Sequence, residues 1–281
     1  MELPGKTAIV TGAGRGIGAG IAHALAREGA NVVVSDRNLE DANAVVKEIL
    51  SSGGSAIPFK ADVTKKADLQ AMVEDTINRF GRVDILVNNA GVESPAVLAQ
   101  DITESDWDRT LAINLKGVFL CCQAVIPTMA QQKKGKIVNI GSIASVRMTF
   151  FGAADYTASK FGVAGLTQHL AWELAESRIN VNAVCPGGVL TEGMEEVTTP
   201  EFREGLEKRL IPLGRLCTPD EIAQGVVFLA SERSDMITGQ LLPVDGGVLV
   251  GYGEDLRTAI RQRMQANKEQ RTQGRKATQM A

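Results

Sequence analysis

Short apolar runs rich in β-branched residues alternate with longer segments of helical spacing, and this alternation limits the possible folds more than any other feature of the chain. In Asn31–Ser35, three consecutive valines leave no polar face, as is typical of a strand that is covered on both sides. Strands joined by helical crossovers lie parallel in one sheet, with helices on both faces. We therefore predict an α/β fold with a single doubly wound, Rossmann-like parallel sheet.

The pattern also predicts where the elements lie. The expected strands are Lys6–Thr11, Asn31–Ser35, Ala56–Lys60, Arg82–Asn88, Lys136–Gly141, Ile179–Cys185 and Gln240–Val244. The expected helical segments are Ile17–Glu28, Leu39–Leu50, Thr64–Phe80, Glu104–Gln132 (one or two helices), Tyr156–Glu176, Glu201–Arg209 and Pro219–Ser231. We expect Thr64 to cap the third helix, and Pro127 to bend or end a helical turn.

No repeat or linker divides the first 250 residues, so we expect one domain over residues 1–251. Residues 252–281 differ, with seven basic and three acidic side chains. Within them, Glu254–Asn267 carries Leu256, Ile260 and Met264 on one helical stripe, and the rest has the composition of a disordered segment. This basic tail is expected to be partly helical or disordered. It is either a solvated end or a helix that packs on a neighbouring subunit or near the site mouth.

Composition excludes several classes of function. The 281-residue chain has only two histidines and four cysteines, and no pair of cysteines has metal or redox spacing, so we expect no metal site. A net charge of −3 gives no reason to expect a nucleic-acid or membrane-surface partner. No apolar run approaches the ~18 residues of a membrane span. Cysteines without a partner and a polar N-terminus indicate a cytoplasmic protein.

A glycine-rich turn, Thr11–Gly18, follows the first predicted strand and opens the first predicted helix. The free N–H groups and positive dipole end of a helix N-terminus bind phosphate, and glycines let the backbone approach it closely. The spacing is G-x-x-x-G-x-G rather than the plain G-x-G-x-x-G, because Ile17 occupies the last glycine position of that motif. The turn therefore predicts a dinucleotide site, with contacts from Gly12, Arg15, Gly16, Ile17 and Gly18.

Asp36 ends the second predicted strand and bears on the choice of dinucleotide. A carboxylate there accepts both hydroxyls of an adenosine ribose and repels a 2′-phosphate, so NAD is favoured over NADP. Arg15 and Arg37 act in the opposite direction, because cations can partly neutralise a phosphate. Two further strand ends belong to the same carboxyl edge, where parallel sheets bind ligands. The residues expected to border the adenine or line the cofactor there are Asp62, Val63, Asn89, Ala90 and Gly91.

Tyr156 and Lys160 are four residues apart in a predicted helix and so share one face. Ser142 follows the preceding strand, and Asn114 lies in the helical stretch before that. A tyrosine with pKa ~10 acts as a base near neutral pH only if its pKa falls by about two or three units. One ammonium ~4 Å away stabilises the phenolate by about the free energy that this fall in pKa costs, at an effective dielectric of 20. The spacing thus predicts a phenol–ammonium pair that exchanges protons beside the cofactor.

With these motifs in this order, the chain resembles the short-chain dehydrogenases/reductases of the single-domain type over residues 1–250. The resemblance rests on Thr11–Gly18, Asn88–Gly91, Asn114, Ser142, the Tyr156–Lys160 motif and Pro186-Gly187 followed by Thr191. It implies that Tyr156 exchanges the substrate proton and that Ser142 hydrogen-bonds the substrate oxygen. It also implies that Lys160 lowers the pKa of Tyr156 and binds the nicotinamide ribose, and that Asn114 holds a water of the proton relay. The residues implied to seat the nicotinamide are Pro186, Gly187, Val189 and Thr191.

These expectations describe an NAD-dependent alcohol dehydrogenase or ketone reductase for a small secondary alcohol or ketone. Two segments should form the substrate pocket: Val146–Phe151, and a loop at about 190–212 that carries Met194, Val197 and Phe202. Both are mostly apolar, and Arg147 either anchors an acidic group or faces solvent. A non-catalytic dinucleotide sensor on the same fold is disfavoured because Ser142, Tyr156 and Lys160 are all intact. An epimerase or dehydratase is disfavoured because 30 tail residues cannot build its second domain.

The helix Tyr156–Glu176 has apolar side chains on more than one face, and a sheet covers only one of them. We therefore expect a helix-pair interface with a second subunit. The family resemblance implies a homotetramer.

Overall fold

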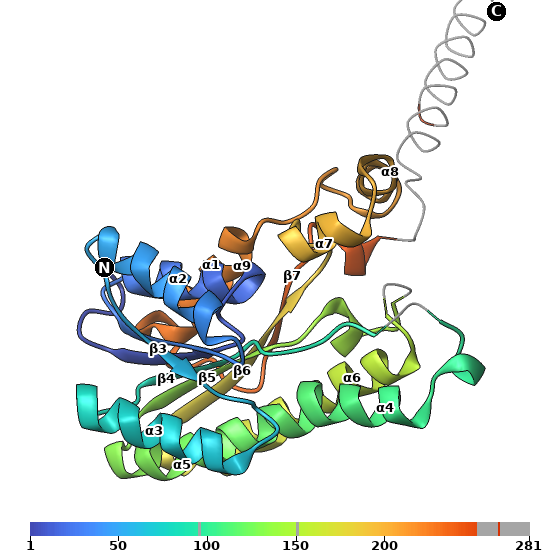
Figure 1. Cartoon of the computed structure of the whole chain (residues 1–281). Helices are drawn as coiled ribbons and strands as arrows, with labels where there is room; N and C mark the ends of the chain where they lie inside the picture. Colours follow the sequence, from blue (N-terminus) through green and yellow to red (C-terminus); the bar gives the residue numbers. More distant parts are fainter. Residues whose placement is uncertain (95–96, 150–151, 252–263, 265–281) are drawn as a thin grey trace, which may run out of the picture.

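The computed structural model describes residues 1–94, 97–149 and 152–251 together with Met264 (Figure 1). In this part of the chain seven strands form one sheet in the order β3-β2-β1-β4-β5-β6-β7, and every pairing is parallel. The strands are β1 (Thr7–Thr11), β2 (Asn31–Asp36), β3 (Ser55–Lys60), β4 (Ile85–Asn88), β5 (Gly135–Ile140), β6 (Ile179–Pro186) and β7 (Leu241–Val244). The predicted fold class is confirmed.

Helices cover both faces of the sheet, as Figure 1 shows. The α-helices are α1 (Gly16–Arg27), α2 (Leu39–Ser51), α3 (Lys66–Phe80), α4 (Glu104–Leu111), α5 (Val118–Gln132), α6 (Ala154–Glu173), α7 (Glu192–Val197), α8 (Pro200–Leu210) and α9 (Pro219–Ala230). A π-helical segment, η2 (Ala112–Gly117), joins α4 to α5. The 3₁₀ turns are η1 (Ala99–Asp101), η3 (Ile143–Ser145), η4 (Ala175–Ser177), η5 (Glu232–Ser234) and η6 (Val248–Val250).

The core consists of two apolar layers separated by the sheet. Successive residues of β1 point to opposite faces, so Val10 joins the layer under α1, α2 and α9, whereas Ile9 joins the layer under α3, α5 and α6. Both side chains are fully buried. This arrangement explains why the strands read as continuous apolar runs.

The structure differs from the expectations at two capping and breaking residues. Thr64 does not cap α3, whose N-cap is Lys65, because the Thr64 hydroxyl donates instead to Asp62 Oδ1 at 2.7 Å. Helix α5 continues through Pro127, and the irregularity of this stretch lies earlier, in η2. Helix α7 was not expected, because its short, mostly polar sequence shows no apolar period.

One helical stretch in the described residues, Glu104–Gln132, has the length and hydropathy of a possible membrane span, against the expectation that no run approaches one. Its inner face is part of the protein core, where the fully buried Cys122, Val125 and Met129 pack in the layer under α3 and α6. The core helix of a globular domain passes the same test of length and composition, so this finding is weak evidence for a membrane.

The strand order reverses between β1 and β4, and open parallel sheets bind ligands at the carboxyl edge of such a point. The register brings the ends of the central strands together at that edge. Thr11 pairs with Ser35, Asn88 with Asn139, and Ile140 with Val184. The segments that follow these residues carry nearly all of the predicted site.

Candidate active site

The glycine turn between β1 and α1 is shaped to receive a phosphate group. Gly12 and Gly16 have φ of +61° and +57°, a conformation that favours glycine. A Cβ atom at Gly12 would lie 2.7 Å from Ala90 Cα, and one at Gly18 would lie 2.2 Å from the Gly12 carbonyl oxygen. Helix α1 starts here without a side-chain cap from Arg15, which leaves its first N–H groups for a ligand. These features fit a dinucleotide pyrophosphate.

Thr11 and Asn89 lock the glycine turn to the end of β4. The Thr11 hydroxyl accepts hydrogen bonds from the backbone N–H groups of Asn89 and Ala90, both at 3.1 Å. The Asn89 side chain donates to the carbonyl oxygens of Thr11 (3.0 Å) and Gly12 (2.8 Å). Sequence reasoning assigned no role to the Thr11 hydroxyl. The available signal was a polar residue at the end of an otherwise apolar strand.

Asp36 lies against the same turn. Its carboxylate accepts from the backbone N–H groups of Gly14 and Asn38, both at 3.0 Å. A Cβ atom at residue 14 would lie 3.0 Å from Asp36 Oδ2, so the carboxylate is in close contact with the turn. Arg15 and Arg37 are exposed, and within the described residues neither forms an ion pair with Asp36.

Asp62 and Val63 follow β3 on the same edge, and both are engaged with protein groups. The Asp62 carboxylate accepts from the backbone N–H (2.9 Å) and the hydroxyl of Thr64, and these bonds lower its pKa. Val63 is buried against Gly117, where an added Cβ would lie 2.8 Å from Val63 Cγ2. The end of β3 is thereby tied to η2.

Ser142, Tyr156 and Lys160 meet beyond the end of β5. Ser142 caps η3, where its hydroxyl accepts from the Ala144 N–H at 3.0 Å. Lys160 is 7% exposed, and its ammonium donates to the Ile140 carbonyl oxygen at 2.9 Å. The same ammonium lies 5.6 Å from the centroid of the Tyr156 ring. The structure therefore brings the three predicted groups into one cluster.

The electrostatics of this cluster differ from the sequence-based expectation. Burial raises the pKa of the half-buried Tyr156 phenol to about 12, although a hydrogen bond with Ser142 acts in the opposite direction. Burial also lowers the pKa of Lys160 to about 8. We expected one nearby ammonium to set the pKa of the phenol, but burial is the largest effect on both groups. The phenol consequently holds its proton at neutral pH, which suits it to act as an acid.

Asn114 lies in η2 and joins three segments of the site. Its side-chain amide donates to the Val92 carbonyl (2.9 Å), and its Oδ1 accepts from the Val92 N–H (2.8 Å). It also donates to the Ser159 hydroxyl at 3.3 Å, and that hydroxyl donates to the Tyr156 carbonyl at 2.7 Å. The buried amide thus clamps the segment after β4 to α6. The implied relay water is a separate role, which these contacts do not address.

The segment after β6 returns to the glycine turn. The Gly187 N–H donates to the Val244 carbonyl at 3.0 Å, and Val189 forms an isolated bridge with Cys217. Thr191 caps α7 by accepting from the Met194 N–H at 3.2 Å. A Cβ atom at Gly16 would lie 3.7 Å from Thr191 Cγ2. Thr191, one of the residues predicted to seat the nicotinamide, therefore borders the turn that is predicted to hold the pyrophosphate.

The predicted substrate segments flank the cluster only in part. Arg147 is exposed and donates from Nη2 to the Val248 carbonyl at 2.7 Å, so one of its donors is already used by the C-terminal turn η6. Met194 packs on the small apolar cluster that contains Ile143 and Val248. Val197 and Phe202 are exposed. Phe150 and Phe151 lie outside the described residues, as does the predicted tail helix apart from Met264.

Sequence reasoning missed three side chains beside the cluster. Asp155 immediately precedes Tyr156, is fully buried, and has no hydrogen-bond partner for either carboxylate oxygen. Cys185 is fully buried near Ser142, Ser145 and Lys160, and burial raises its pKa. Glu93 carries a charge that acts on both Tyr156 and Lys160. Spacing does not reveal these contacts, because each depends on how loops and strand ends meet.

Known proteins resemble this chain in both sequence and fold. A family model described as enoyl-(acyl carrier protein) reductase matches residues 12–249. The 3-oxoacyl-[acyl-carrier-protein] reductase FabG of Thermotoga maritima is 40% identical over 250 residues, which are 89% of this chain and 100% of that protein. D-threitol dehydrogenase of Mycolicibacterium smegmatis is 44% identical over 250 residues, 89% of this chain and 95% of that protein.

A solved short-chain type dehydrogenase/reductase from Mycobacterium marinum superposes with a TM-score of 0.84 at 34% identity, covering 89% of this chain and 98% of the other. The family model spans strands β2 to β7 and includes Asp36, Asn114, Ser142, Tyr156 and Lys160. The chain is thus an oxidoreductase that uses a nicotinamide dinucleotide, and it belongs to the short-chain dehydrogenase/reductase family.

Proposed function

We propose that the protein transfers a hydride between NAD(H) and a secondary alcohol or ketone, with Tyr156 as the general acid and base. The observation that carries this proposal is the meeting of Ser142, Tyr156 and Lys160 beyond β5, on the same sheet edge as the glycine turn after β1. Residues 1–251 form the catalytic unit in this proposal. Reduced, buried cysteines are consistent with action in the cytoplasm.

Ser142, Tyr156 and Lys160 each have a separate role in the proposed reaction. The Ser142 hydroxyl holds the substrate oxygen, and Tyr156 gives that oxygen its proton when a ketone is reduced. A phenol with a pKa of about 12 is protonated at neutral pH and is ready for this direction. Bound nicotinamide would supply or accept the hydride. The Lys160 ammonium stabilises the phenolate that remains, and below a pH of about 8 it carries its charge.

Asp36 supports NAD over NADP. Its carboxylate is fixed by two backbone donors against the glycine turn, so a ribose 2′-phosphate at that position would meet a negative charge. Asp36→Ser should raise kcat/KM with NADP at least tenfold while lowering it with NAD. Glu74→Gln, on the exposed face of α3, is the matched control. A wild-type preference for NADPH in steady-state kinetics would contradict this part of the proposal.

A panel of secondary alcohols with NAD, in which the absorbance of the NADH formed is measured, tests the reaction class. We expect turnover of at least one small or cyclic alcohol, with loss of that turnover in Tyr156→Phe. Cofactor binding without any turnover across alcohols and ketones would instead support a non-catalytic dinucleotide sensor. The intact cluster of Ser142, Tyr156 and Lys160 favours the enzyme.

The substrate class and the assembly remain proposals of their own. One relative is named for a 3-oxoacyl chain on a carrier protein and another for D-threitol, so the names of the relatives do not point to one substrate class. We propose a small-molecule alcohol or ketone as the substrate of this chain. We also propose a homotetramer, because apolar side chains are exposed along α5 and α6.

A further inference from the structure

Glu93 is the one acidic side chain that the fold holds beside the catalytic tyrosine through the segment after β4. Its neighbour Val92 is held on both backbone groups by Asn114, at 2.8 and 2.9 Å. On the other side, the Ser94 hydroxyl accepts from the Ala153 N–H at 3.1 Å, and Ala153 is the N-cap of α6. The backbone of Glu93 is therefore fixed from both sides, between the Asn114 clamp and the start of the Tyr156 helix.

The Glu93 carboxylate is exposed, and among the described residues it has no hydrogen-bond or ion-pair partner. Three other carboxylates near the site are engaged, and a fourth, that of Asp155, has no hydrogen-bond partner but is fully buried. Asp36 and Asp62 accept backbone N–H groups, and Asp245 accepts from Gly247 and Leu249, both at 2.8 Å. Glu93 thus has free acceptor oxygens on a segment that is held next to the start of the Tyr156 helix.

The charge of Glu93 reaches the reacting groups. It raises the pKa of both Tyr156 and Lys160, and Cys185 acts on both in the same direction. Arg147, the exposed cation of the segment before α6, donates instead to the Val248 carbonyl. In the described part of the site, Glu93 therefore has no cation paired with it, and an anionic substrate would approach an unneutralised carboxylate.

We propose that Glu93 is a specificity-determining residue that selects neutral polyhydroxylated alcohols and disfavours anionic substrates. This inference rests on the proposed function and names its substrate class. A carboxylate accepts hydrogen bonds from hydroxyl groups at short distance, and such charge-assisted bonds are about twice as strong as neutral ones. A substrate hydroxyl next to the reacting carbinol donates to the Glu93 carboxylate. A carboxylate or phosphate group on a substrate is repelled by it.

The test compares four-carbon alcohols at one pH and at physiological salt: butan-2-ol, butane-2,3-diol, threitol and 3-hydroxybutyrate. For the wild type we expect kcat/KM to rise from butan-2-ol to the diol and to threitol, and to be lowest for 3-hydroxybutyrate. Glu93→Gln keeps the shape and removes the charge. It should lower kcat/KM for threitol about tenfold, mainly through KM, and raise it for 3-hydroxybutyrate.

A second readout separates this role from a structural one. Because Glu93 raises the pKa of Tyr156, Glu93→Gln should move the midpoint of the pH–rate profile for alcohol oxidation to lower pH. Glu74→Gln, which removes an exposed carboxylate from α3, should change neither the preference nor the midpoint. An unchanged preference and midpoint in Glu93→Gln, with an active wild type, overturn the Glu93 proposal alone. A wild type that turns over no alcohol or ketone overturns the proposed function and this inference with it.

Discussion

Lys160 is a proposed catalytic residue whose burial also lowers the stability of the fold. Its ammonium is almost completely buried, and within the described residues its only hydrogen-bond acceptor is the Ile140 carbonyl. A carbonyl dipole compensates less for lost hydration than a carboxylate does, which is why the pKa of Lys160 falls to about 8. Lys136 offers a contrast, because its buried ammonium pairs with Asp235 at 2.8 Å.

Lys160→Met should therefore stabilise the protein at pH 7 while abolishing turnover. A fall in pKa from 10.5 to about 8 means that the charged Lys160 lowers the free energy of unfolding by roughly 3 kcal/mol below pH 8. The variant gains this amount, less about 1 kcal/mol for the lost hydrogen bond to Ile140. The unfolded chain binds more protons than the native chain between pH 8 and 10.5, so wild-type stability rises over that window. The advantage of the variant should shrink there.

Thermal unfolding followed at several pH values checks this prediction. The matched control is Lys136→Met, which removes a buried ammonium but leaves the half-exposed Asp235 without its partner, and should give no comparable gain. A Lys160→Met protein that is less stable than the wild type at pH 7 would show that burial of the Lys160 ammonium costs the fold little stability.

Tyr156→Phe removes the hydroxyl that we propose as acid and base, and keeps the ring. We expect kcat to fall by about 10³-fold, within the usual range for general acid–base catalysis. The dissociation constant for NADH should change by less than about twofold, since the glycine turn and Asp36 are untouched, and the free-energy equivalent is under ~0.4 kcal/mol. Fluorescence titration and single-turnover measurements check the two parts. Tyr252→Phe, which alters the chain's other tyrosine, is the control.

At the scale of elements, the sequence predicts strands and helices well because the sheet is buried on both sides. The run Asn31–Ser35 became β2, one residue longer, and the helix expected over Leu39–Leu50 became α2, again one residue longer. The sequence pattern did not predict the π-helical segment η2. Its register depends on the contacts of Asn114 with Val92 and Ser159, which come from other elements. The pKa of Tyr156 was not predicted for the same reason, since burial is a tertiary property.

Gly18 tests how closely β1, α1 and β4 must pack where they meet. In Gly18→Ala the new Cβ would lie 2.2 Å from the Gly12 carbonyl oxygen and 2.4 Å from Asn89 Nδ2. The turn must shift, so NAD binding should weaken at least tenfold and the protein should lose stability. Gly205→Ala in α8 is the control, because an added Cβ there meets only the end of the flexible Arg209 side chain and α8 should gain about 0.5–1 kcal/mol.

Calorimetric titration with NAD and thermal unfolding of both variants distinguish the effects. Normal NAD affinity in Gly18→Ala would mean that the turn tolerates a Cβ and that its close packing does not shape the cofactor site.

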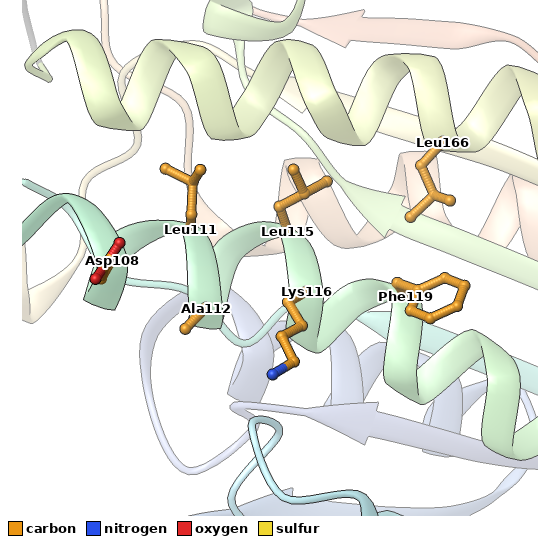
Figure 2. A pocket seen from close by; sticks show the side chains of 7 residues that line it. All are labelled: Asp108, Leu111, Ala112, Leu115, Lys116, Phe119 and Leu166. Carbon is orange, nitrogen blue, oxygen red and sulfur yellow. The ribbon is translucent and has the colours of Figure 1, made fainter.

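At the scale of the whole molecule, the second half of the domain exposes an apolar groove between α4–α5 and α6. Figure 2 shows Leu111, Leu115 and Phe119 on one side and Leu166 on the other. The groove has a volume of about 570 Å³ and is lined by Asp108, Leu111, Ala112, Leu115, Lys116, Phe119 and Leu166. Phe161 and Trp172 of α6 are exposed as well, at 45% and 79%. Exposed apolar side chains in such numbers are typical of a subunit interface.

We expect this surface to pair with itself across a two-fold axis and to form one of the two kinds of interface in a tetramer with three such axes. Light scattering of the wild type should then give four times the chain mass of 29.9 kDa. Phe119→Glu buries a charge without a partner in that interface, and should halve the mass by leaving the second interface intact. Leu50→Glu, an exposed apolar residue of α2 on the opposite face, should leave the tetramer unchanged. A wild type that stays monomeric at micromolar concentration would mean that the groove between α4–α5 and α6 serves something other than assembly.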